Sequence, residues 1–341
     1  TRCSFAPGVA EKLVEDLQKT KVETLKGETI EIIGQFVEPV QLQVVCQNLW
    51  NELPPDVMVI TEEYRAKNVD IDRPLAKFYE NAISEAVKQT GIPENILRDW
   101  CVKWLITSTG TRGIVHRGQK ETDGIPNRAL EILEDMHLLR SVWRAGAHWY
   151  ELTHDRFIDP IRTSNESWRG EKADQALILI REAEQDINFQ KYQRALDASR
   201  SAYLISEEVG DLQSEAIALL YHGKAYEGLK QNGEALTSYT KALGIVKQTK
   251  AREVETYVLL SQGSLFMQMN DYEKALQCYT NYITLLPNDS VGYYNLGLTY
   301  FNLGENERAI DHYTHALVLD PGDVDAYNNR GRTYYKLGDY E

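Results

Sequence analysis

Small and aromatic residues recur at a fixed spacing in the C-terminal half of the chain. Successive glycines of this pattern lie 40, 34 and 34 residues apart, and the first three are each followed by an alanine twelve positions later and a tyrosine four positions after that. Such a period predicts stacked helical hairpins whose two helices cross closely at the small residues. The glycines, each followed after three positions by an aromatic residue, are Gly223/Tyr226, Gly263/Phe266, Gly297/Tyr300 and Gly331/Tyr334.

The run over residues 290–321 has further small and aromatic positions in the same register. These are Tyr293, Leu296, Gly297, Tyr300, Ala309, Tyr313, Ala316 and Pro321. The set resembles the positions that define the tetratricopeptide repeat family. A weaker repeat precedes, with Ala183 in the place of the glycine. The resemblance implies an α-α superhelix over residues 166–341, with repeats near 176, 216, 256, 290 and 324, the last of them truncated.

Ligands of such arrays bind on the concave wall that the first helices of the repeats form. We expect a protein or peptide partner there, anchored by rings and oriented by amide groups. Packing against the next repeat is the alternative for some of these side chains. The Lys/Asn/Arg set with which chaperone-binding relatives hold a C-terminal carboxylate is incomplete in this sequence. The predicted partner-binding residues are Tyr257, Leu260, Tyr294, Asn295, Leu298, Asn328, Asn329 and Arg332, and the predicted wall also contains Ile217, Leu220, Lys224, Ser264, Met267, Phe301 and Tyr335.

Helices and strands alternate in the middle of the chain, over residues 36–165. Apolar stripes predict helices over 39–53, 74–90, 93–105 and 126–137. Short strands are predicted over 114–117, 138–143 and 148–152. A triplet of helices that ends with 126–137, followed by the strands 138–143 and 148–152 as a two-stranded wing, makes a winged-helix domain. The predicted fold class is therefore mainly α, with a winged helix ahead of the superhelix.

Winged helices often bind DNA through the helix that precedes the wing. In this chain that helix sets Arg128 against Glu131, Glu134 and Asp135. The net charge is −14, from 51 acidic and 37 basic residues, and no basic patch stands out. Nucleic acid and anionic membrane are therefore disfavoured as partners. A DNA-binding transcription regulator with a repeat sensor domain is kept as the alternative function.

Four sequence blocks follow one another ahead of the repeats. They are FVEPVQLQVVC at 36–46, GTRG at 110–113, GIPN at 124–127 and YELTHDRF at 150–157. Over residues 8–162 the chain resembles the region after the ATPase core in the novel STAND family of bacterial signal-transduction NTPases. The resemblance implies an upstream ATPase core that binds ADP or ATP with Mg²⁺, and it makes residues 1–35 the tail of a helical arm with a linker hairpin. It also implies oligomerisation on activation and a role in bacterial stress signalling or antiviral defence.

Thr153-His154-Asp155 occupies the place of the Met-His-Asp motif that ends the winged helix in STAND proteins, with threonine in place of methionine. In that family the histidine contacts the β-phosphate of ADP, so the resemblance assigns His154 and Asp155 to nucleotide sensing in the full-length protein. An imidazole can donate to a phosphate oxygen, and the aspartate can orient the ring. The alternative is a structural histidine beside Asp155 as the cap of a helix that begins at Arg156.

The sequence contains no evident catalytic or metal-binding set. It lacks GxxxxGK[ST] and an apolar strand ending in paired acids, so we expect no enzyme activity and no cofactor of its own. The four cysteines share no ligand spacing and indicate reduced thiols in a cytoplasmic protein, and no apolar run is long enough to span a bilayer. The expected function is the regulatory and sensor portion of a STAND-type ATPase. The cysteines are Cys3, Cys46, Cys101 and Cys278.

Overall fold

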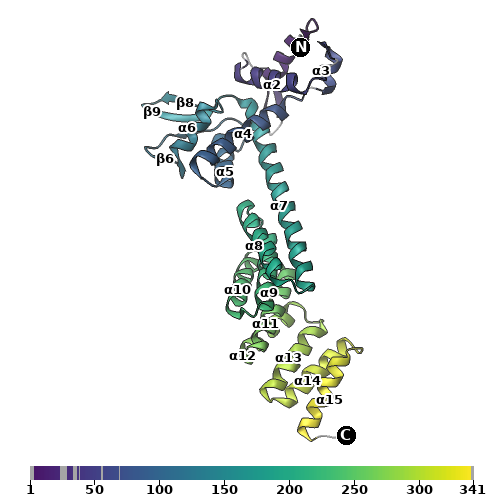
Figure 1. The fold of residues 1–341 in the computed structure, drawn as a ribbon. Coiled ribbons are helices and arrows are strands. Elements are labelled where there is room, and N and C mark those ends of the chain that lie inside the picture. The colour runs from purple at the N-terminus through teal and green to yellow at the C-terminus, as the bar shows by residue number, and fades with distance from the viewer. Residues whose placement is uncertain are drawn as a thin grey trace. The chain divides into compact units, whose positions relative to one another are not determined.

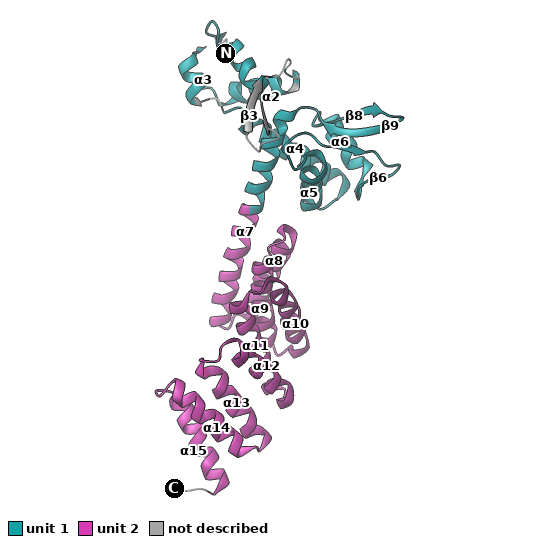
Figure 2. Ribbon diagram, turned by 180° about the vertical axis from the view of Figure 1, so that it is seen from behind, with its two compact units in different colours: residues 1–169 teal, residues 170–341 magenta. Residues whose placement is uncertain are grey.

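The chain divides into two compact units, Thr1–Arg169 and Gly170–Glu341, which Figure 2 colours separately; Figure 1 labels the helices and strands. The structure is a computed structural model that describes residues 4–23, 29–33, 37, 39–54, 57–68 and 70–338. Cys3, Phe36 and Glu38, which the sequence analysis named, lie outside these ranges. The units share one long helix, α7 (Ile158–Asn188), so the predicted boundary near residue 165 falls inside a helix.

Unit 1 begins with a group of short elements. The helix α1 is amphipathic and buries Val9, Leu13 and Leu17 on one side. β1 and β4 pair in parallel, and β2 and β3 pair antiparallel as the hairpin predicted ahead of residue 34. The β1-β4 pair was not predicted, because two-residue strands carry no periodicity. The elements are β1 (Ser4–Phe5), α1 (Val9–Gln18), β2 (Lys19–Glu23), β3 (Thr29–Ile33), α2 (Pro39–Glu52), β4 (Val59–Ile60) and α3 (Glu62–Asn68).

The rest of unit 1 packs three helices against a three-stranded antiparallel sheet of order β5-β9-β8. The helices and strands expected from 39 to 152 are present, with ends within two residues of those predicted. This agreement concerns the elements, and the winged-helix assignment itself stays a prediction. The elements are α4 (Asp72–Thr90), α5 (Glu94–Leu105), β5 (Ile114–His116), β6 (Glu121–Thr122), β7 (Ile125–Pro126), α6 (Asn127–Asp135), β8 (Leu139–Arg144), β9 (Ala147–Leu152) and the 3-10 helix η1 (Asp155–Phe157).

The core of unit 1 joins the apolar faces of these helices to the inner face of the sheet. Leu97, Leu133, Tyr150 and Phe157 are all fully buried in it. The buried carboxylate of Glu151 is satisfied at the sheet by two arginines of β8, as a buried charge requires.

Unit 2 is a succession of antiparallel helical hairpins. Aspartates cap four of its helices by accepting from backbone N–H groups in the first turn, at Asp211, Asp271, Asp289 and Asp323. The second and third hairpins begin at Leu212 and Arg252, before the expected starts near 216 and 256. The elements after α7 are α8 (Tyr192–Val209), α9 (Leu212–Gly228), α10 (Asn232–Thr249), α11 (Arg252–Gln268), α12 (Tyr272–Leu285), α13 (Ser290–Leu303), α14 (Asn306–Leu319) and α15 (Val324–Leu337).

No helix within the described ranges is both long and apolar enough to cross a membrane.

Candidate functional site

A groove of about 560 Å³ runs across the first helices of successive hairpins in unit 2. α9, α11 and α13 each supply side chains to it, so residues about 35 apart in sequence meet on one wall. Its lining combines aliphatic side chains with ammonium, hydroxyl and amide groups. The lining residues are Ile187, Tyr192, Lys224, Glu227, Gly228, Lys230, Leu260, Ser261, Ser264, Gln268, Tyr279, Val291 and Asn295.

A second hollow of about 550 Å³ adjoins this groove, because Leu260 and Val291 line both. It lies between α11, α12 and the start of α13, and its walls are richer in apolar side chains. Its lining residues are Arg252, Glu253, Thr256, Tyr257, Leu260, Tyr282, Leu285, Leu286, Asp289 and Val291.

Lys224 is the half-buried cation of the first groove. Its Nζ lies 5.4 Å from the centre of the Tyr221 ring. Within the described residues its ammonium makes no hydrogen bond and no ion pair within 4 Å. Burial lowers the pKa of Lys224, while the carboxylates of Glu184 and Glu227 act in the opposite direction. The groove therefore holds a partly desolvated positive charge.

Two of the three acidic residues that line the two hollows, Glu227 and Asp289, have carboxylates that are hydrogen-bonded within the protein. Glu227 accepts hydrogen bonds from the Tyr239 hydroxyl, at 3.0 Å, and from the Gln268 amide. Asp289 accepts from the Tyr282 hydroxyl at 2.7 Å and caps α13 at Val291 N. These contacts tie the helices together and leave fewer carboxylate lone pairs for a ligand.

Three of the predicted partner-binding residues lie in these hollows. Leu260 lines both, Asn295 lines the first and Tyr257 lines the second, where 52% of its surface is exposed. The Asn295 amide donates one hydrogen bond to its own helix, at Val291 O (2.8 Å).

Tyr294, Asn329 and Arg332 form a separate cluster between the last two hairpins. The Asn329 amide donates to the Tyr294 hydroxyl at 3.0 Å, and Arg332 donates to Asn329 Oδ1 at 3.4 Å. Asn295 and Asn329, two of the amides expected to orient a ligand, therefore have different surroundings, and Asn329 already joins two repeats. The structure places Leu298, which is half-buried, and Asn328, which is exposed, outside both hollows.

The prediction that Leu220 lines the concave wall is wrong. It is only 4% exposed and packs with Leu219 and Tyr239 in the core between hairpins. Leu219, Leu220 and Ala218 are all buried, so apolar residues surround this part of α9 and periodicity cannot identify its open face.

Some lining residues were missed by sequence reasoning. Lys230 comes from a turn, Gln268 from a helix end, and Ile187 and Tyr192 from the preceding repeat. No repeat position marks them, because the curvature of the stack brings them to the groove.

His154 lies at the start of η1, where its ring acts as the helix cap. The Arg156 N–H donates to His154 Nδ1 at 3.0 Å. In the neutral ring the proton is then on Nε2. Asp155, considered as the cap in the sequence analysis, instead pairs with Arg112, whose guanidinium also donates to Leu152 O at 3.2 Å.

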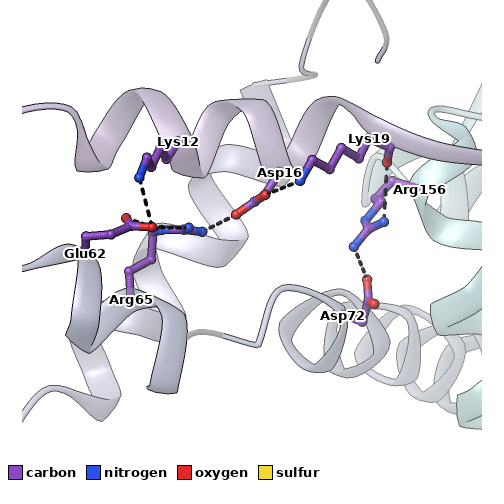
Figure 3. A network of polar contacts seen from close by, with 7 residues as sticks. All are labelled: Lys12, Asp16, Lys19, Glu62, Arg65, Asp72 and Arg156. Carbon is purple, nitrogen blue, oxygen red and sulfur yellow. Dashed lines mark hydrogen bonds and ion pairs between the residues drawn. The ribbon is translucent and has the colours of Figure 1, made fainter. Parts of the chain in front are cut away.

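Arg156 connects this segment to two other elements of unit 1. Its guanidinium pairs with Asp72 of α4 at 2.8 Å and donates to the Lys19 carbonyl at 3.3 Å, as Figure 3 shows. The carboxylate of Asp16, on α1, forms ion pairs with the side chains of Lys19 and of Arg65, which lies on α3. The helices α1 and α3 therefore belong to the same polar network (Figure 3). A displacement of η1 would break contacts to both α4 and β2.

The described part of the chain gives little support for a metal site, a reactive cysteine or a DNA-binding helix. No group of three metal-ligating side chains occurs there. Burial raises the pKa of the Cys101 thiol to about 12 and that of Cys278 to about 11, which disfavours the reactive thiolate. On α6, the Glu131 carboxylate pairs with Arg117 at 2.7 Å and lies 3.9 Å from Arg128. This pairing reduces the positive charge available for a DNA backbone.

Comparison with known proteins identifies a repeat family in unit 2. Residues 263–304 and 298–338 match the TPR, or tetratricopeptide, repeat family. Comparison with curated proteins found no match. Among solved structures, MamA from Desulfovibrio magneticus RS-1 is 19% identical over 49% of this chain and 88% of its own, with a TM-score of 0.41. YrrB, a TPR protein with an unusual peptide-binding site, is 21% identical over 52% and 85%, with a TM-score of 0.39.

Proposed function

We propose, from the premise that unit 2 carries tetratricopeptide repeats, that its groove binds a segment of a partner protein. The observation that carries this proposal is the continuous lining by α9, α11 and α13, in which Leu260 joins two hollows. Repeat arrays of this kind present extended concave surfaces for binding. Exposed rings and aliphatic groups supply contact area, and the amides, hydroxyls and ammonium groups orient a peptide.

A peptide selection tests this proposal. Random twelve-residue peptides are displayed and selected on the full chain, and the affinities of enriched peptides are measured by fluorescence anisotropy. Tyr257→Ala should weaken their binding at least roughly tenfold, because this ring lines the second hollow. Tyr327→Ala is the matched control, since Tyr327 is 48% exposed and lies outside both hollows. Equal losses in the two variants would contradict binding in the groove.

We further propose that unit 1 is the regulatory winged helix of a STAND-type signalling ATPase whose core lies outside this chain. Three helices packed on a small antiparallel sheet support this interpretation, as does the position of His154 at the segment that follows the sheet. With Nδ1 used by the cap, Nε2–H is the atom that can donate to a phosphate oxygen. Partner binding in the repeats would shift this unit away from the nucleotide, and the proposed outcome is exchange of ADP for ATP and oligomerisation.

The nucleotide proposal is tested on the full-length protein by measuring ADP affinity. His154→Asn should weaken ADP binding roughly ten- to hundredfold, because it removes one charge-assisted hydrogen bond while asparagine remains a good cap. Thr153→Ser is the neighbouring control and should bind ADP normally. This chain alone should hydrolyse no ATP. Unchanged ADP affinity in His154→Asn would refute the proposed contact.

A further inference from the structure

A stacked pair of rings joins the two helices of the hairpin formed by α13 and α14. The Tyr300 ring lies parallel to the His312 ring, with the two centroids 5.2 Å apart and the planes at 6°. The guanidinium of Arg308 lies 5.6 Å from the centre of the same tyrosine ring. Tyr300 thus has both a cation and an imidazole as neighbours, two contacts that stabilise an aromatic ring.

The preceding hairpin keeps the cation but lacks the imidazole. The residues 34 positions earlier are Phe266, Lys274 and Cys278. The Lys274 ammonium lies 5.4 Å from the centre of the Phe266 ring, which repeats the contact between cation and ring of the next hairpin. Cys278 stands in the place of His312, and among the described residues no aromatic ring contacts Phe266. The smaller side chain leaves room for a ring at this position.

A third hollow, of about 440 Å³, lies beside Phe266 and Cys278. Side chains of α10, α11 and α12 form its walls, and Leu243, Leu259 and Leu285 supply apolar surface. It shares Leu285 with the second hollow and no residue with the first. Pockets of this volume bind small molecules of one or two rings.

Gln262 supplies hydrogen-bond donors to this third hollow. Its side chain lines the hollow, although only 8% of the residue is exposed. The Cys278 thiol donates to Gln262 Oε1 at 3.7 Å, and burial raises the pKa of this thiol to about 11, so it stays protonated at neutral pH. The N–H groups on Nε2 have no acceptor among the described residues. An acceptor atom on a ligand would satisfy this largely buried amide.

We propose that the third hollow binds a small molecule with a planar nitrogen heterocycle. Its ring packs against Phe266 as His312 packs against Tyr300, and a ring nitrogen accepts a hydrogen bond from the Gln262 amide. A single imidazole from a partner protein would fill only part of the volume, which favours a free molecule of two rings. This site is separate from the proposed binding of a partner segment and gives unit 2 a second kind of ligand.

Benzimidazole and indole test the chemistry of the ligand. The two molecules share a frame of two fused rings, but at neutral pH benzimidazole has a ring nitrogen that accepts a hydrogen bond, whereas indole only donates. Each is titrated into the full chain while NMR follows the leucine methyl groups. Saturable shifts are expected at Leu243, Leu259 and Leu285. Benzimidazole should bind roughly three- to tenfold more tightly than indole, because one hydrogen bond separates them.

Variants of α12 locate the binding. Asn281 is an exposed lining residue, and the corresponding residue of the next hairpin is His315. Asn281→Trp should fill the third hollow from its rim and weaken benzimidazole binding at least roughly tenfold. Thr280→Trp is the matched control, because Thr280 is exposed on the same helix and lines none of the three hollows.

A variant of α11 tests the hydrogen bond. Gln262→Leu introduces the residue that the next hairpin has at this position, Leu296, so the fold should tolerate it. The variant should bind benzimidazole no more tightly than indole and leave the affinity for indole nearly unchanged.

Three results would overturn the inference. They are the lack of saturable shifts with benzimidazole, shifts that persist in Asn281→Trp, and equal affinities of the parent protein for benzimidazole and indole. None of these measurements uses a peptide. Binding of a partner segment is therefore decided separately, by the effect of Tyr257→Ala on the selected peptides.

Discussion

The ring of Tyr313 packs against the backbone of Gly297, so closely that a β-carbon added to this glycine would lie 2.7 Å from Tyr313 Cδ1. The same relationship holds one repeat earlier, between Gly263 and Tyr279 (2.6 Å). The glycine and tyrosine of each pair are sixteen residues apart on the two helices of a hairpin. Because the glycine has no side chain, it leaves the space that the buried tyrosine ring occupies.

Gly297→Ala should destabilise the repeat array. The added methyl group would force the Tyr313 ring to move, an overpacking cost of about 1–3 kcal/mol, which over most of this range exceeds the gain of about 1 kcal/mol from alanine in a helix. Gly244→Ala is the control, because it lies in α10 with no atom within 4 Å of its added carbon, and it should stabilise slightly. Urea unfolding followed by circular dichroism measures both. Similar shifts in the two variants would contradict this packing.

Acid should destabilise the array through His222. Burial, with Arg200 and Lys241 nearby, lowers the pKa of His222 from 6.5 to about 4, so the folded protein keeps the ring neutral. The unfolded chain binds the proton first as pH falls. The free energy of unfolding therefore decreases between pH 6.5 and about 4, by at most about 3 kcal/mol.

His222→Gln removes this titration and keeps a polar group that can reach Ser238, whose hydroxyl lies 3.2 Å from His222 Nδ1. Unfolding curves of the two proteins from pH 7 to pH 4.5 should diverge, with the flatter dependence in the variant. Parallel curves would assign the acid sensitivity to other groups.

The capping bond of His154 should contribute to stability independently of any nucleotide. His154→Ala leaves the Arg156 N–H without its acceptor and should lower the free energy of unfolding of unit 1 by about 0.5–2 kcal/mol. His154→Asn should restore most of this loss, because asparagine caps well. Thermal unfolding of the chain in the absence of nucleotide makes the comparison, and equal stability of the alanine variant and the parent would exclude the cap.

Arg98 should be the most sensitive arginine of unit 1. It is 4% exposed, and its guanidinium donates to Glu94, Ser164 and Asn165 at 2.7, 3.2 and 2.8 Å. Arg98→Met takes a donor from the buried Ser164 and Asn165 and breaks the ion pair with the partly exposed Glu94, and it should cost about 1–3 kcal/mol. Arg169→Met breaks an exposed pair with Asp99 and should cost about 0–1 kcal/mol. Denaturant midpoints that shift equally would refute the distinction.

The sequence by itself determined the repeats, because their spacing reflects a local requirement: a residue without a side chain must stand opposite each buried tyrosine ring. It also indicated the helices and strands of unit 1, since amphipathic periodicity extends over ten or more residues in α4, α5 and α2. The assignment of those elements to a winged helix and a STAND ATPase stays a prediction.

Only the tertiary structure decided which of the predicted residues share a groove. Leu220 and Leu260 are both apolar residues on first helices, yet one packs in the core and the other lines two hollows. The lack of an ion partner for Lys224 among the residues that the structure describes, and the capping bond of His154, likewise depend on neighbours that periodicity does not specify. The surroundings of a side chain arise from the curvature of the stack and from contacts between distant segments. The local pattern of apolar and polar residues predicts neither.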